Sequence, residues 1–74
     1  MKKYVIAIKY NGEFTGKYVS MVNYKRDVWD SGEKPKVFNA LYSVEKAKEQ
    51  VLKYATAIDL VIFRLEEFKE DHNV

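Results

Sequence analysis

The chain has 74 residues, of which 47% are hydrophobic and 15% aromatic, and it contains no cysteine. A chain of this length forms one domain that buries only about 60% of its unfolded surface. Without cysteine, disulfide bonds and thiolate metal ligands are excluded. The net charge is only +2, whereas a nucleic-acid-binding protein typically has a strongly basic, clustered surface.

The charge is divided unevenly along the chain, with a net +4 over residues 1–36 and a net −2 over residues 37–74. No stretch approaches the roughly 20 apolar residues of a membrane helix. The apolar run 4–8 is too short for a signal peptide, and Lys9 ends it. We therefore expect a cytoplasmic protein without a membrane partner.

The first two predicted elements are strands over residues 3–10 and 17–24. The first alternates in character, and one of its faces carries Tyr4, Ile6, Ile8 and Tyr10. The second strand is apolar on both faces. Because Asn11-Gly12 and Gly16 lie between the two strands, we expect a hairpin.

The register of this hairpin has three alternatives. A two-residue turn at Asn11-Gly12 would place Lys17 opposite Ile6. A four-residue loop over residues 11–14 would place Lys17 opposite Ile8, and a longer loop would select the other face of the second strand. Because the second strand is apolar on both sides, the pattern does not decide between them.

The middle of the chain contains a turn signal, Asp30-Ser31-Gly32, between two short apolar pairs. We favour a second hairpin in which Val28-Trp29 lies opposite Val37-Phe38. The alternative is a mobile surface loop over residues 27–36. Residues 37–40 form either a short third strand or an extended lead into a helix.

An amphipathic helix is predicted from Ser43 onward. Ser43 is a suitable N-cap because its hydroxyl can accept a hydrogen bond from a first-turn N–H, and Glu45 then lies at the positive end of the helix dipole. Apolar residues recur at spacings of three, four and seven, in a stripe made of Val44, Ala47, Val51, Ala55 and Ile58. This stripe should cover one face of the sheet.

The last predicted strand runs from Leu60 to about Glu67. Its first four residues are apolar on both faces, which favours a central strand or one whose second face is also covered. Residues 69–74 are charged and are expected to fray. The predicted domain therefore spans residues 1–68.

The element order β-β-(β)-α-β predicts an α+β fold with two layers, in which one helix covers a three- to four-stranded, mostly antiparallel sheet. The helix joins the third strand to the last one. If the last strand is parallel to a neighbour, a right-handed crossover is expected.

Residues suited to catalysis are scarce. His72, the single histidine, lies in the segment expected to fray, where it cannot be held near a substrate proton. Asp27 and Asp30 are two loop carboxylates, which are too few oxygen ligands for a metal site. The glycines do not form a phosphate-binding loop. We expect no enzymatic activity, no cofactor and no metal.

Protein binding is the leading hypothesis, as an adaptor, an inhibitor or a homodimer. A single helix cannot cover both faces of the sheet, so the second face would expose Val5, Ala7, Leu60 and Ile62, and such an apolar patch usually marks an interface. Tyr24, Arg26 and Trp29 lie close together in a projecting segment and are of the types enriched at binding hot spots. A competing interpretation is that Trp29 folds over the open face and closes a second small core.

Binding of single-stranded nucleic acid is the alternative hypothesis. It would use aromatic rings to stack on bases and lysines to contact phosphates, in the set Lys9, Tyr10, Lys17, Tyr18 and Lys25. The chain lacks the aromatic signature of an RNA-recognition strand. Affinity that falls steeply with salt would favour this hypothesis over an apolar interface.

Residues 37–68 read VFNALYSVEKAKEQVLKYATAIDLVIFRLEEF, an extended segment, a helix beginning near a serine, and a Val/Ile-rich strand ending in acidic residues. This run, with the opening MKKYVIAIKYNGEFTGKYVSM, resembles short uncharacterised proteins of temperate bacteriophages of Gram-positive hosts. The resemblance implies an accessory phage protein that binds a host or phage protein. It transfers no functional residue.

Overall fold

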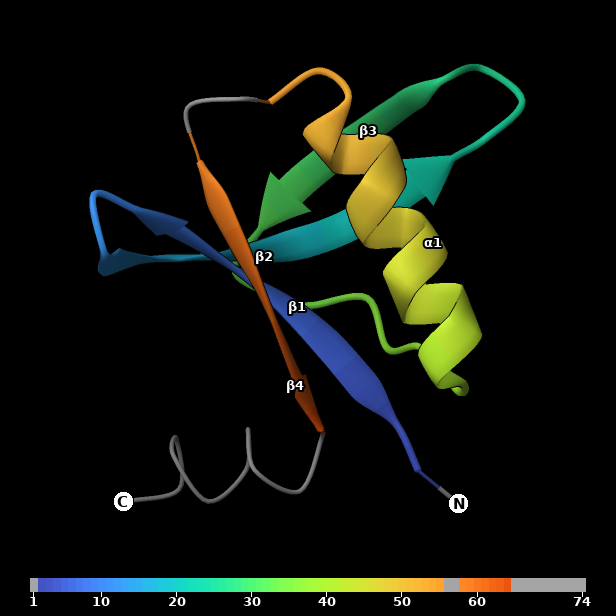
Figure 1. Cartoon of the computed structure of the whole chain (residues 1–74), viewed down its shortest axis with the longest axis horizontal. Coiled ribbons are helices and arrows are strands. Elements are labelled where there is room, and N and C mark those ends of the chain that lie inside the picture. Colours follow the sequence, from blue (N-terminus) through green and yellow to red (C-terminus); the bar gives the residue numbers. More distant parts are fainter. Residues whose placement is uncertain (1, 56–57, 65–74) are drawn as a thin grey trace.

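The computed structural model describes residues 2–55 and 58–64. These contain the strands and helix β1 (Tyr4–Tyr10), β2 (Glu13–Asn23), β3 (Val28–Gly32), α1 (Leu41–Leu52) and β4 (Asp59–Arg64). The strands form one antiparallel sheet of order β3-β2-β1-β4, and α1 lies across one of its faces (Figure 1). The predicted two-layer α+β class is confirmed. Within the described ranges, no helix is long and apolar enough to cross a membrane.

The β1–β2 hairpin combines two of the predicted registers. It starts as a two-residue turn at Asn11-Gly12, whose φ angles are 51° and 80°. An irregularity then inserts Thr15 and Gly16, so that Ile8 lies opposite Lys17, as in the four-residue loop. Gly16 adopts a φ of 81°, and the Thr15 hydroxyl donates a 2.8 Å hydrogen bond to the Ile8 carbonyl. The Thr15 hydroxyl thus provides the Ile8 carbonyl with a hydrogen-bond partner at the bulge, where the regular strand pairing is interrupted.

Val28-Trp29 pairs with β2, so the prediction that it lies opposite Val37-Phe38 is wrong. The reason is the tight turn before it. The Arg26 N–H donates a 3.0 Å hydrogen bond to the Asn23 side chain, and Asp27 adopts a left-handed φ of 56°. Asn and Asp tolerate such conformations, which allows the chain to reverse and pair β3 with β2.

The segment before α1 is an extended lead rather than a full strand. Phe38 exchanges two backbone hydrogen bonds of 2.8 Å with Tyr4 and forms an isolated bridge. Because this pairing fixes the chain beside β1, the helix begins sooner than predicted. Ala40 is the N-cap residue and makes no side-chain cap bond, so the predicted cap at Ser43 is wrong. Glu45 consequently lies beyond the first turn.

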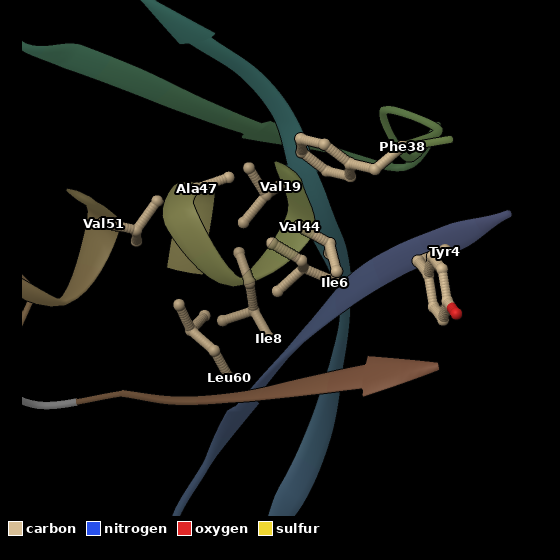
Figure 2. Close-up of a cluster of buried hydrophobic side chains, with 9 residues drawn as sticks. All are labelled: Tyr4, Ile6, Ile8, Val19, Phe38, Val44, Ala47, Val51 and Leu60. Atoms are coloured by element: carbon tan, nitrogen blue, oxygen red, sulfur yellow. The ribbon is translucent and has the colours of Figure 1, made fainter. Parts of the chain in front are cut away.

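A cluster of buried side chains fills the space between α1 and the sheet (Figure 2). The helix contributes Val44, Ala47 and Val51, as the stripe predicted, while the strands and the lead contribute Tyr4, Ile6, Ile8, Val19, Phe38 and Leu60. Ala55 and Ile58 pack against the cluster beyond the end of the helix. Gln50 is also buried, which the apolar pattern did not predict.

β4 lies at the edge of the sheet, antiparallel to β1, so the interpretation of it as a central strand is wrong. Its Leu60 lies opposite Ile8, and its Ile62 lies opposite Ile6. Both side chains therefore face α1, and the expectation that they lie on the uncovered face is also wrong. The predicted strand end at Glu67 and the segment 69–74, which includes the histidine, lie outside the described residues.

The face of the sheet away from α1 is buried at its centre. Val5 is 0% exposed and Ala7 is 2% exposed, so their predicted exposure is wrong. Phe63 lies opposite Val5, and Tyr18 lies opposite Ala7 with its ring 5.2 Å from that of Phe14. Larger side chains thus flank the small ones of β1, as directly opposed residues in a sheet do.

Candidate functional site

The β2–β3 turn is joined to the end of α1 by side-chain hydrogen bonds. The Tyr54 hydroxyl and the Gln50 amide each donate to one carboxylate oxygen of Asp27. These hydrogen bonds hold the pKa of Asp27 below its ordinary value, and the bond from Tyr54 has the larger effect. The same carboxylate raises the pKa of Tyr54 through the hydrogen bond and its negative charge. Residues that are far apart in the sequence therefore form one polar contact.

A second contact joins the turn to the middle of α1. The Lys46 ammonium lies 4.8 Å from the centre of the Tyr24 ring, within the range of a cation–π interaction. Burial raises the pKa of Tyr24, and the nearby Tyr42 raises it further. The Tyr24 ring is thus held beside the helix, although 45% of the residue remains exposed.

Three tyrosines consequently share one side of the molecule, and we call Tyr24, Tyr42 and Tyr54 the tyrosine surface. Their exposed fractions are 45%, 76% and 61%. Tyr42 lies in the first turn of α1 and Tyr54 two residues past its end, so they are roughly 18 Å apart along the helix axis. An open depression of about 300 Å³ lies on this side and is lined by Tyr42, Glu45, Lys46 and Glu49.

The structure separates the residues predicted to bind a protein. Tyr24 and Arg26 lie in the β2–β3 turn and are exposed. Trp29 is half-buried and packs against the cluster under α1, so it neither projects nor closes a second core on the far face. Leu60 is 2% exposed, and Ile62 packs against the same cluster. Of the residues predicted to bind a protein, only Tyr24 and Arg26 in the turn are exposed.

The residues predicted to bind nucleic acid are distributed over both faces of the sheet and both ends of β2. This set is Lys9, Tyr10, Lys17, Tyr18 and Lys25. Lys17 pairs with Ile8 on the side of α1, whereas Tyr18 points to the far side. Tyr18 is 4% exposed, so its ring cannot stack on a base. Lys25 lies in the β2–β3 turn, at the other end of β2.

Tyr42 and Tyr54 were not identified from the sequence. Tyr42, Lys46 and Glu49 recur at spacings of four and three, which is the signal of a shared helix face. A helix that begins at Ser43 leaves Tyr42 outside it, so the predicted boundary hid the fact that Tyr42 shares a helix face with Lys46 and Glu49. The contact of Tyr54 with the turn joins positions 27 apart and has no local sequence signal.

Neither a metal-binding cluster nor a relative identifies the site further. Across residues 2–55 and 58–64, no group of three or more His, Cys, Asp or Glu side chains could hold a metal ion. Comparisons with protein-family models, with curated proteins and with solved structures find no match for this chain.

Proposed function

We propose that this protein is a non-enzymatic protein-binding module that contacts its partner through the tyrosine surface. The observation that carries the proposal is that the turn and the helix hold three tyrosines on one side while leaving them 45–76% exposed. Tyrosine provides a large, rigid contact area that can also form hydrogen bonds, and it is enriched at interface hot spots.

In the unbound protein, two of the three rings are already held by contacts within the chain. Tyr54 donates a hydrogen bond to Asp27, and Tyr24 lies against Lys46. Immobilising a free side chain on binding costs about 0.5–1.5 kcal/mol, so rings that are already held reduce this cost. A preformed surface of this kind suits an adaptor or an inhibitor.

The length of the surface fits a short peptide segment. Roughly 18 Å between Tyr42 and Tyr54 corresponds to five or six extended residues at about 3.3 Å each. The resemblance of residues 37–68 to short phage proteins would make this segment part of a host or phage protein. A second copy of the chain is the alternative source. Sedimentation at micromolar concentration separates the two, since a dimer that depends on the tyrosines would assign the surface to self-association.

A library of displayed random peptides, panned against the purified protein, tests the proposal. We expect the selected peptides to bind the wild type and to lose about tenfold or more in affinity for Tyr42→Ser and for Tyr24→Ser. The matched control is Tyr10→Ser, because Tyr10 is 52% exposed but lies in the β1–β2 hairpin, away from α1 (Figure 1). This control should leave the affinity unchanged.

The opposite result would be peptides that bind all three variants equally or that depend on Tyr10. Circular dichroism establishes that each variant is folded before its affinity is measured. Tyr42→Ser keeps the test decisive if the other variant is unstable, because Tyr42 is 76% exposed and exposed substitutions rarely change stability by more than about 0.5 kcal/mol.

A further inference from the structure

We infer that the partner inserts an arginine side chain into the depression lined by Tyr42, Glu45, Lys46 and Glu49. This inference rests on the proposed protein-binding function and specifies the chemistry of the segment that is bound. At about 300 Å³, the depression is at the small end of ligand pockets, so it suits one long side chain rather than a bulky molecule.

The first argument is the charge of the depression. Glu45 and Glu49 are four positions apart on α1, so their carboxylates lie on the same helix face. Like charges at this spacing destabilise a helix. Within the described part of the chain, neither carboxylate takes part in an ion pair. A cation placed between them would therefore relieve their repulsion.

The second argument concerns the lysine that lines the depression itself. Lys46 also lines the depression, but its ammonium lies over the Tyr24 ring at 4.8 Å. Lys53 lies close enough to Asp27 to contribute to its lowered carboxyl pKa. The four side chains that line the depression carry two negative charges and one positive charge, so a positively charged group complements them.

The third argument distinguishes arginine from lysine. Tyr42 is 76% exposed and offers an uncovered ring beside the two carboxylates. A guanidinium group can stack on an aromatic ring and donate paired hydrogen bonds to a carboxylate, whereas an ammonium group is a point charge with strong hydration. Two carboxylates next to an aromatic face therefore favour the guanidinium group.

The test measures one peptide selected through the tyrosine surface, with its arginine either intact or replaced by citrulline. Citrulline keeps the shape of arginine but is uncharged. We expect this replacement to weaken binding to the wild type about five- to tenfold. The same replacement should weaken binding to the Glu45→Gln/Glu49→Gln variant less than about twofold, because the carboxylates are then absent. The matched control is Glu13→Gln, which removes one negative charge from the β1–β2 hairpin and should preserve the full citrulline effect.

Two different failures can be told apart. Selected peptides that depend on Tyr42 but lack arginine, or whose citrulline effect is the same in the double variant, would overturn this inference and leave the proposed function intact. A library that gives no peptide dependent on the tyrosines would overturn both. A citrulline effect that Glu13→Gln abolishes as well would show a long-range charge effect and would overturn the assignment to the depression.

Discussion

Val5→Ala tests whether the centre of the far face of the sheet is buried, as the structure shows. Val5 and Val19 are both 0% exposed but point to opposite faces, Val19 into the cluster under α1 and Val5 away from it. Replacing either valine by alanine, as Val5→Ala or Val19→Ala, removes two methyl-sized groups worth about 0.8 kcal/mol each and leaves a cavity. We expect each variant to lose about 1.5–3 kcal/mol of unfolding free energy.

Urea unfolding provides the measurement. With a slope of roughly 1 kcal/mol/M for a small domain, each midpoint should fall by about 1.5–3 M. The matched control is Val37→Ala, because Val37 is 42% exposed and should cost less than about 0.5 kcal/mol. If Val5→Ala behaves like this control while Val19→Ala is strongly destabilised, the far face is open in solution and the reasoning is refuted.

Three further outcomes are expected. Gly16→Ala should lower the free energy of unfolding by about 1–2 kcal/mol, measured by thermal unfolding, because the φ of Gly16 is 81°. Gly32→Ala is the control and should lower it less, because the φ of Gly32 is ordinary and the added Cβ would lie 3.6 Å from Ser20. Equal losses in the two variants would exclude backbone strain at the bulge. The hydrogen bonds of Tyr54 and Gln50 lower the pKa of Asp27, so its carboxylate contributes stability above its unfolded pKa, and this contribution is lost as the pH falls through the lower folded pKa. Asp27→Asn should therefore reduce the loss of stability at acid pH measured by urea unfolding, and an unchanged acid profile would contradict this. The same carboxylate raises the pKa of Tyr54, so Asp27→Asn should lower the pH at which Tyr54 ionises in ultraviolet absorbance, and an unshifted titration would argue against the contact.

The fold class could be predicted from the sequence because burial periodicity is a local property. The alternation of β1 and the stripe of Val44, Ala47 and Val51 each follow from a single element that buries one side. Both patterns are present in the structure. They are sufficient to place one helix on one sheet, whatever the detailed pairing of the strands.

Pairing and helix boundaries could not be predicted, because contacts distant in sequence decide them. The β1–β2 hairpin begins as a two-residue turn and then changes register where Gly16 allows a bulge. The start of α1 follows from the backbone pairing of Phe38 with Tyr4. This pairing overrode the local preference for Ser43 as a cap, and local propensities are commonly overridden in this way.

The candidate site was predicted only in part, for the same reason. Tyr24 could be singled out because tyrosine is enriched at binding hot spots and because it lies close to Arg26 and Trp29 in a segment predicted to project. Its companions Tyr42 and Tyr54 depended on a helix boundary and on the contact of Asp27 with Tyr54, neither of which a local pattern encodes. Trp29, by contrast, was predicted either to project or to cover the far face, because its pairing with β2, which directs it toward the core under α1, has no local sequence signal.

The most direct test of the proposed binding surface is a map of amide chemical-shift changes in the ¹⁵N-labelled protein during titration with a selected peptide. The proposal predicts that the largest changes fall on the β2–β3 turn and along α1, at Tyr24, Tyr42, Lys46 and Tyr54. Changes concentrated on β4 or on the β1–β2 hairpin, with these four positions unaffected, would contradict it.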